Sequence, residues 1–226
     1  MRQHPVALIL AGGRSTRMGL DKRSLALGGG SLLEHAVALG QAVCGRAVLS
    51  GMTVPPDGLA LDCLPDARPG MGPMGGVATA LDALGEPVLA LACDMPLLAE
   101  DALRTLLAVR AAAPASSLVT CYRHQGTGYL EPLCAVYEPG ALPHLVRAMD
   151  SGRLGLGRAV PEALRSHVAV PAGMGGDFFN LNRPEDLKRL ADADIGAGTS
   201  AGPRVAEGAD GAHAPTTYGT YRAGKP

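Results

Sequence analysis

The chain has 226 residues, 47% of them hydrophobic, and a formal net charge of −1 at pH 7. This length can bury one sizeable core, and the near balance of charge excludes a large basic surface for nucleic acid. The five cysteines form no Cys-x-x-Cys pair, and no apolar run is long enough for a signal peptide or a membrane span. The composition therefore predicts a cytoplasmic protein with reduced thiols and with neither membrane nor nucleic acid as a partner.

Short apolar runs alternate with helical stretches along the chain. Strands are predicted at residues 6–10, 46–50, 59–64, 87–93, 117–122 and 167–170. Helices are predicted at residues 31–43, 77–84, 100–113, 139–149 and 184–192, and a capping box from Ser31 to Glu34 opens the first of them. Continuously apolar strands that alternate with helices predict an α/β domain whose mostly parallel sheet is covered on both faces.

The last part of the chain differs in composition. Residues 195–226 are rich in Gly, Ala, Thr, Ser and Pro and have no apolar period. Such a segment cannot bury enough apolar surface to offset its ordering entropy. We therefore predict one domain over residues 1–194 and a disordered tail over residues 195–226.

The first predicted strand leads into a glycine turn that is surrounded by cations, in the stretch LAGGRSTRMGLDKRSL at residues 10–25. Gly12 and Gly13 let the backbone turn tightly, and successive N–H groups in such a turn bind anions. Arg14, Arg17 and Lys22 add mobile positive charge. The pattern favours a polyphosphate site over a glycine turn with solvated surface cations. It is not a Walker A loop, because G-x-x-x-x-G-K-[ST] does not occur.

A second glycine-rich segment, PGMGPMGGV at residues 69–77, matches the G-x-G-x-x-G pattern of dinucleotide sites. Pro69 and Pro73 stiffen this segment, and the stretch that precedes it makes a poor strand. The segment therefore favours a loop on which a ligand lies against the backbone, with a nicotinamide site as the alternative.

A carboxylate, Asp94, ends the apolar run in LACDMPLL. A carboxylate at the end of a buried strand is costly unless it is paired, hydrogen-bonded or bound to a cation. Asp94 could cap the following helix, or it could bind Mg²⁺, which prefers one or two carboxylates plus substrate phosphates. The glycine turn on the same edge of the sheet favours the metal.

Two asparagines lie two residues apart in FFNLNRPEDL. Asn180 and Asn182 share a face if the backbone is extended, and an amide oxygen can join a metal shell. The alternative is that Asn182 caps the helix predicted from Pro184.

Together these motifs resemble the nucleotidyltransferases that build the molybdenum cofactor, and among them the guanylyltransferases of the MobA type. The resemblance runs from about Val6 to Leu190 and rests on LAGGRSTRMGLDKRSL, PGMGPMGGV, LACDMPLL and NLNRPEDL. It implies a Rossmann-like three-layer α/β/α fold and a Mg²⁺-dependent transfer of GMP from GTP to the molybdopterin phosphate, with release of pyrophosphate. It also implies molybdenum-insertion proteins or apo-molybdoenzymes as protein partners.

The resemblance also implies roles for individual residues. Nucleotide contacts would come from Leu10, Ala11, Gly12, Gly13 and Asp66. Arg17 and Lys22 would hold the phosphates in catalysis, and Asp94 would bind Mg²⁺. Asn180 and Asn182 would lie near the pterin phosphate or the metal.

The sequence departs from the family pattern at one position. Ser50 stands where the guanylyltransferases often have an asparagine that touches the nucleotide, and Glu131 in GYLEPLCAVY resembles the family without an assigned role. A phosphate monoester is largely ionised near neutral pH and needs no strong base. This agrees with histidines that are scattered along the chain and are expected at the surface or in the core. They are His4, His35, His124, His144, His167 and His213.

Three other functions remain open from sequence. The first is a cytidylyltransferase or another NTP:phosphate nucleotidyltransferase. Cytidylyl enzymes more often have Ala-Ala-Gly where this chain has Ala11-Gly12-Gly13. The second is a nucleotide- or pterin-binding protein without catalysis, and the third is a nicotinamide oxidoreductase.

Overall fold

The structure is a computed structural model that describes residues 2–11, 26–27, 30–56, 58–170, 176–181 and 186. Several predicted features lie outside these residues. They are the glycines and cations of residues 12–22, Asn182, His213 and the tail at 195–226.

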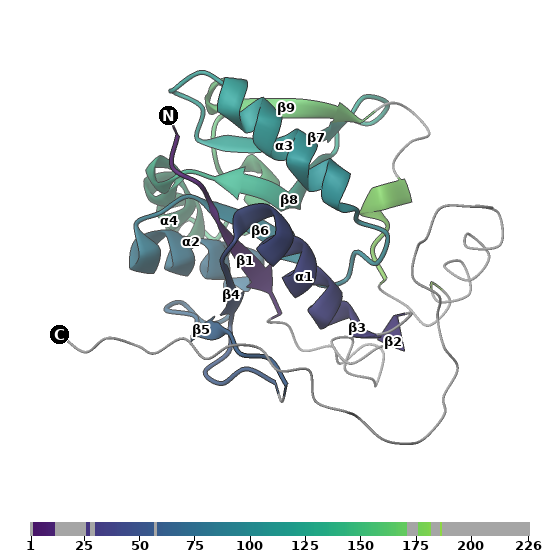
Figure 1. The fold of residues 1–226 in the computed structure, drawn as a ribbon. Helices are drawn as coiled ribbons and strands as arrows, with labels where there is room; N and C mark the ends of the chain where they lie inside the picture. The colour runs from purple at the N-terminus through teal and green to yellow at the C-terminus, as the bar shows by residue number, and fades with distance from the viewer. Residues whose placement is uncertain are drawn as a thin grey trace.

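A seven-stranded sheet forms the middle of the molecule, in the order β5-β4-β1-β6-β8-β7-β9 (Figure 1). β1 pairs in parallel with β4 and β6, β4 with β5, and β7 with β9, whereas β8 is antiparallel to both β6 and β7. The strands are β1 (Val6–Leu10), β4 (Ala47–Ser50), β5 (Asp62–Leu64), β6 (Val88–Ala92), β7 (Val119–His124), β8 (Leu130–Tyr137) and β9 (Arg165–Val170). A separate two-stranded sheet joins β2 (Ala26–Leu27) to β3 (Gly30–Ser31).

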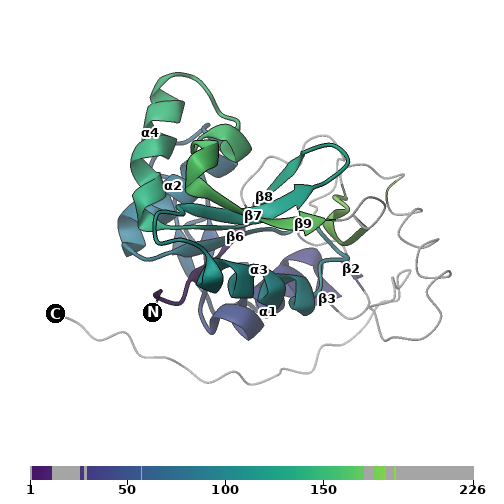
Figure 2. The same ribbon diagram turned by 90° about the horizontal axis from the view of Figure 1, so that it is seen from above.

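Helices cover both faces of the large sheet, so the predicted three-layer fold is confirmed. Figure 2 shows α1 (Leu32–Cys44) and α3 (Glu100–Ala112) on one face, and α2 (Gly72–Leu84) and α4 (Leu142–Asp150) on the other. Each face has its own apolar core, because side chains alternate along each strand. Ile9 and Leu91 pack on the α1 and α3 side, whereas Leu8 and Ala90 pack on the α2 and α4 side.

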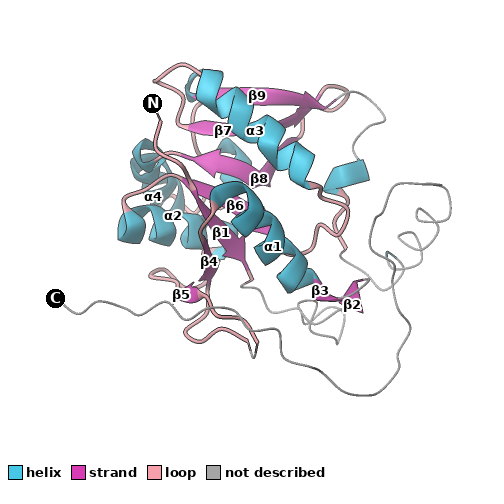
Figure 3. Cartoon of the chain, in the orientation of Figure 1, coloured by secondary structure: helices cyan, strands magenta, loops and turns pink. Residues whose placement is uncertain are grey.

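The capping box that predicts the first helix is confirmed in detail. The Glu34 N–H donates to Ser31 Oγ at 3.2 Å, and the Ser31 N–H donates to Glu34 Oε2 at 2.6 Å. The helix ends at Gly45, whose φ of +72° is a left-handed conformation that glycine adopts without strain. Helix, strand and loop segments are distinguished by colour in Figure 3.

Several elements differ from the sequence prediction, and the short strands β2 and β3 were not predicted. β8 was missed, because Pro132 and the polar Glu131 interrupt the apolar run in its first half. α2 begins at Gly72, five residues before the predicted start. The residues that the sequence predicts as a glycine-rich loop form its first turn. Of the helix predicted at residues 184–192, the structure describes only Asp186, which is helical.

The five cysteines are all free thiols. Burial raises the pKa of Cys44 and of Cys121 to about 12, which keeps both protonated and unreactive at neutral pH. In the part of the chain that the structure describes, no helix is both long and apolar enough to cross a bilayer.

Candidate functional site

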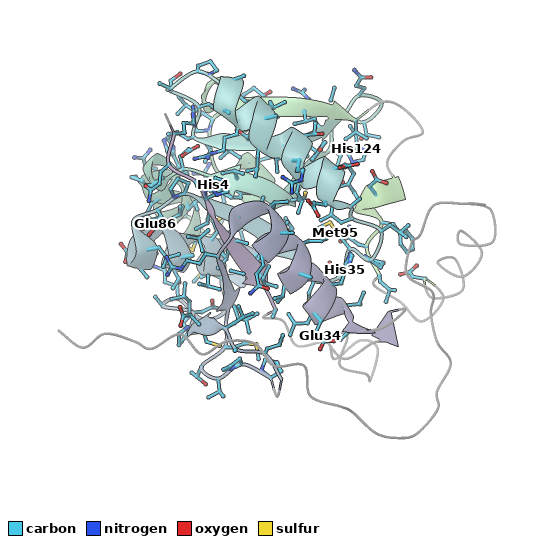
Figure 4. The ribbon with its side chains drawn as sticks, in the orientation of Figure 1. His4, Glu34, His35, Glu86, Met95 and His124 are labelled. Atoms are coloured by element: carbon cyan, nitrogen blue, oxygen red, sulfur yellow. The ribbon has the colours of Figure 1, made fainter. Side chains whose placement is uncertain are left out.

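The carboxyl ends of three strands meet at one edge of the sheet, as the sequence predicts. Leu10 at the end of β1 is in register with Ser50 of β4 and with Ala92 of β6. In Figure 4, the labelled Met95, which directly follows Asp94, lies on the same side of the molecule as His35 and His124. His4 and Glu86, which precede β1 and β6, lie toward the opposite side. Ligands of open α/β sheets bind beyond the carboxyl ends of the strands, so this edge is the candidate active site.

The first strand brings Leu10 and Ala11 to this edge, and both are buried. Gly12 and Gly13 follow Ala11 in the sequence. Gly12, Gly13, Arg17 and Lys22 lie outside the described residues, so their placement at the site stays a prediction.

Asp66 lies in the loop between β5 and α2, and one of its carboxylate oxygens can accept a hydrogen bond. Its Oδ1 is buried and has no hydrogen-bond partner among the described residues. Burial raises the pKa of Asp66, and a hydrogen bond from the hydroxyl of Ser50 lowers it in part. Ser50, only 3% exposed, thus holds the carboxylate whose Oδ1 a ligand N–H or O–H could satisfy. Ser50 acts here on Asp66 rather than simply filling the place of an asparagine.

The loop that carries Asp66 is fixed by α2 and α4. The Ala67 N–H donates to Thr79 Oγ1 at 3.1 Å, and Arg68 Nη1 lies 2.7 Å from Asp150 Oδ1. A methyl group added to Gly75 would lie 3.0 Å from the Arg68 carbonyl oxygen, so the loop also rests directly on the helix backbone. The loop of Asp66 therefore contacts both helices.

The second glycine segment does not have the geometry of a dinucleotide fingerprint. That fingerprint requires glycines that directly follow a strand. Here β5 ends at Leu64, and Gly70 follows after five residues of loop. Gly75 and Gly76 lie inside α2, where they allow close packing. The expectation of a ligand loop over the whole segment is thus wrong for its second half, and the nicotinamide alternative loses its main support.

Asp94 follows β6 and is not the cap of the next helix. α3 begins at Glu100 after Ala99, and no side chain caps it. Oδ1 of Asp94 is buried, and its carbonyl oxygen accepts the Leu181 N–H at 2.9 Å. This backbone hydrogen bond brings the segment of Asn180 to the loop of Asp94, so the predicted metal ligand Asp94 and the predicted cofactor-binding residue Asn180 lie on neighbouring segments.

The side chain of Asn180 makes a local hydrogen bond. Its Nδ2 donates to the Phe178 carbonyl oxygen at 3.1 Å, which fixes the amide plane. The described residues contain no group of three or more His, Cys, Asp or Glu side chains that could hold a metal ion. A cation at this edge would therefore depend on Asp94, on amide oxygens and on ligand oxygens.

A histidine–glutamate pair was missed from sequence. His124, at the end of β7, has its Nε2 2.7 Å from Oε1 of Glu131, which is 6% exposed. Burial raises the pKa of Glu131, and the hydrogen bond from His124 lowers it in part. His124 is thus neither a plain core residue nor a plain surface residue. In the sequence, the GYLEPL motif gives one sign of this pair, because it places the carboxylate of Glu131 at the start of an apolar run.

A cavity of about 680 Å³ opens on the α4 side of the sheet, beside β7, β8 and β9. Three arginines and one glutamate give it a positive balance, and Tyr129 adds an exposed ring. The charged lining residues are Arg123, Arg158, Glu162 and Arg165. Glu162 pairs with Arg123 and Arg165, each at 2.9 Å, and so offsets one of the three positive charges within the cavity.

Comparison with known proteins agrees with this geometry. Residues 7–168 match the model of the MobA-like NTP transferase domain. A Chloroflexus aggregans protein named "Probable molybdenum cofactor guanylyltransferase" is 37% identical over 196 residues, which cover 80% of this chain and 90% of that protein. A "Molybdenum cofactor guanylyltransferase" from Rhodobacter capsulatus is 35% identical over 193 residues, which cover 82% of this chain and 94% of that protein.

Solved structures show the same fold. Molybdopterin-guanine dinucleotide biosynthesis protein A from Archaeoglobus fulgidus superposes with a TM-score of 0.65 at 24% identity, over 85% of this chain and all of that one. A 2-C-methyl-D-erythritol 4-phosphate cytidylyltransferase from Thermus thermophilus superposes with a TM-score of 0.55 at 18% identity, over 84% of this chain and 98% of that one. The chain therefore belongs to the MobA-like NTP transferase family.

Proposed function

We propose that this protein transfers GMP from GTP to the phosphate of molybdopterin, and that pyrophosphate is the second product. One observation carries the proposal most directly. The buried Oδ1 atoms of Asp66 and Asp94 lie on segments that follow strands at the one sheet edge where the glycine turn begins. The guanylyltransferase names of relatives above 30% identity support the choice of substrates.

In the proposed reaction, an oxygen of the acceptor phosphate attacks the α-phosphorus of GTP. One P–O bond forms to the acceptor, the bond between the α- and β-phosphates breaks, and the electron pair leaves with pyrophosphate. Arg17 and Lys22 would neutralise the phosphates and the leaving group, because charge neutralisation and positioning provide most of the catalysis in such transfers. Leu10, Ala11, Gly12 and Gly13 would line the nucleotide, with Asp66 accepting a hydrogen bond from it.

A divalent cation, which we propose to be Mg²⁺, suits the oxygen donors of this edge. Asp94 and Asn182 would hold it, with Asn180 nearby, and the nucleotide phosphates and water would complete the shell. Mg²⁺ is commonly bound in this way, through one or two carboxylates plus substrate phosphates. Its contribution when bound is to polarise the α-phosphate and offset its charge. The cytoplasm is the location that we propose for the reaction, with molybdenum-insertion proteins or apo-molybdoenzymes as partners.

Lys22→Ala tests the proposed function. We expect kcat/KM for pyrophosphate release with GTP, Mg²⁺ and molybdopterin to fall by about 10²–10³, because an aligned charge contact in the transition state is lost. Thermal stability should hardly change. Arg104→Ala is the matched control, because this exposed cation on α3 pairs, among the described residues, with Glu100 of its own helix. A near wild-type rate together with a collapsed melting temperature would show that Lys22 is structural.

A further inference from the structure

The pairing between β6 and β8 stops near the carboxyl end of β6. The β7–β8 register runs regularly to Cys121 opposite Ala135 and then jumps to Tyr122 opposite Glu131. Adjacent residues of β7 are thus paired with residues of β8 that lie four positions apart. Residues 132–134 of β8 therefore have no partner in the β7–β8 register. β6 pairs with β8 only as far as Leu91 opposite Cys134. The start of β8, with Glu131, therefore extends beyond the last β6–β8 pair, on the side where the Asp94 loop follows β6.

The segment 176–181 packs between the end of β7 and the Asp94 loop. Phe178 is buried, and its ring centroid lies 4.6 Å from that of Tyr122 and 5.8 Å from that of His124. At the other end of the segment, Leu181 is buried and donates its N–H to the Asp94 carbonyl oxygen. The segment thus connects the end of β7 to the Asp94 loop, and Asn180 lies between its two anchors.

Glu131 supports the first of these anchors. Its Oε1 lies 2.7 Å from His124 Nε2, and the His124 ring contacts Phe178 edge-on, at an interplanar angle of 75°. Phe178 in turn accepts the Asn180 side-chain N–H through its carbonyl oxygen. A continuous chain of contacts therefore leads from the buried carboxylate through His124 and Phe178 to Asn180.

A buried carboxyl group opposes folding unless its hydrogen bonds compensate for desolvation. Glu131 is 6% exposed and has a histidine, not an arginine, as its partner. A second histidine–glutamate pair on the other face of the sheet, His167 with Glu162 at 3.1 Å, is different, because the Glu162 side chain is 59% exposed. Retaining a costly buried carboxyl at the edge that carries the candidate site is typical of functional residues.

We propose that Glu131 is a positioning residue for the acceptor: through His124 and Phe178 it sets Asn180 beside the Asp94 loop, where the acceptor phosphate binds. The inference rests on the proposed function for the identity of the acceptor, but the positioning itself does not. This positioning requires a side-chain oxygen that can accept the hydrogen bond from His124, and it does not require a negative charge. A glutamine at position 131 should therefore keep the positioning function, and an alanine should lose it.

The kinetic test compares Glu131→Ala and Glu131→Gln, with Glu162→Ala of the exposed pair as the matched control. We expect Glu131→Ala to raise the KM for molybdopterin at least tenfold and to leave the KM for GTP within about twofold, because only the acceptor side loses its support. Glu131→Gln should restore most of the acceptor KM. Glu162→Ala should change neither constant. If Glu131→Ala does not fold, His124→Gln carries the same prediction.

Two kinetic outcomes would overturn the proposal. Equal changes in both KM values would mean a general loss of structure. A glutamine variant as impaired as the alanine variant would assign the carboxylate charge, and not positioning, as the function.

Hydrogen exchange gives a readout that does not depend on the substrates. The Leu181 amide proton should exchange at least tenfold faster in Glu131→Ala than in the wild type, and at the wild-type rate in Glu162→Ala. Unchanged exchange would overturn the positioning role. If instead the wild type fails to use GTP and molybdopterin but Leu181 exchange responds as expected, the proposed function is wrong and the positioning role of Glu131 stands.

Discussion

At the residue scale, Ser50 and Gly76 form a pair that determines how α2 sits on the strand ends. A methyl group on Gly76 would overlap Ser50 Oγ and would lie 3.1 Å from Leu10 Cδ2. We expect Gly76→Ala to destabilise the protein by about 1–3 kcal/mol, as overpacking of a tight core does. Chemical denaturation would measure this difference in the free energy of unfolding.

Ser50→Ala provides the control for that prediction, because it removes the oxygen with which the new methyl group collides. The double variant should recover at least about 1 kcal/mol relative to the sum of the two single changes. Simple additivity would show that Leu10 or the helix backbone, and not Ser50, limits the space at Gly76.

The two histidine–glutamate pairs should respond to pH with opposite signs. Burial raises the pKa of Glu131 above its ordinary value of 4.5, so the stability linked to its protonation is fully present below that value and is lost as pH rises through the folded pKa. The pKa of Glu162 is lowered, chiefly by the hydrogen bond from His167. Its contribution is therefore present above 4.5 and is lost as pH falls through the folded pKa.

Unfolding free energies at about pH 4 and pH 7 test this contrast. Relative to the wild type, Glu131→Gln should become more stable as pH rises, and Glu162→Gln should become less stable. The same sign for both variants would mean that burial does not dominate the pKa of Glu131.

Sequence reasoning identified Asp66 through family resemblance, and Asp94 because it ends an apolar strand. It could not identify the Glu131–His124 pair, which depends on the three extra residues of β8. A change in register leaves no periodic signal in the sequence, so only the structure brings these two side chains together.

At the scale of elements, an ion-pair cluster around the buried Arg110 ties the N-terminal residues to α3 and to Glu138, which follows β8. Arg110, 5% exposed, makes two hydrogen bonds to Glu138, at 2.8 and 3.1 Å, and donates to the Gln3 carbonyl oxygen. Arg2 also contacts Glu138, at 2.6 Å. We expect Glu138→Ala to cost about 3–5 kcal/mol of folding free energy, because it leaves the Arg110 charge buried without its partner.

Asp150→Ala is the matched control. It breaks the 2.7 Å pair with Arg68, in which the Asp150 side chain is 61% exposed. Exposed ion pairs contribute at most about 1 kcal/mol to the free energy of unfolding. The melting temperature of Asp150→Ala should therefore stay near that of the wild type. Similar losses from Glu138→Ala and Asp150→Ala would contradict the buried character of the cluster.

Helices and strands were predicted correctly where a single sequence pattern, such as an apolar run or a capping box, was strong. The apolar strand Val6–Leu10 matches its predicted bounds, and the capping box fixed the start of α1. The prediction failed at β8 and at the start of α2, where proline, glycine and a glutamate read as loop. In both places tertiary packing overrides local propensity.

At the scale of the whole molecule, the strand order places the parallel strands β1, β4 and β6 side by side and adds an antiparallel β8 next to β6. The nucleotide half that we propose for the site would lie at the ends of the parallel strands, whereas Glu131 and the segment 176–181 lie by β7 and β8. One edge of the sheet thus offers two neighbouring regions, as the joining of two phosphorylated substrates requires.

Label transfer tests guanylyl transfer most directly. The protein is incubated with Mg²⁺, molybdopterin and either GTP or CTP labelled with ³²P at the α-phosphate, and kcat/KM is measured for labelled dinucleotide. A site that hydrogen-bonds the guanine edge can reject the wrong base by up to ~10⁴-fold, and Gly12 leaves room for a purine. We therefore predict strong transfer from GTP and little from CTP. Equal or better transfer from CTP would contradict the guanylyl assignment, and no transfer from either nucleotide would contradict catalysis.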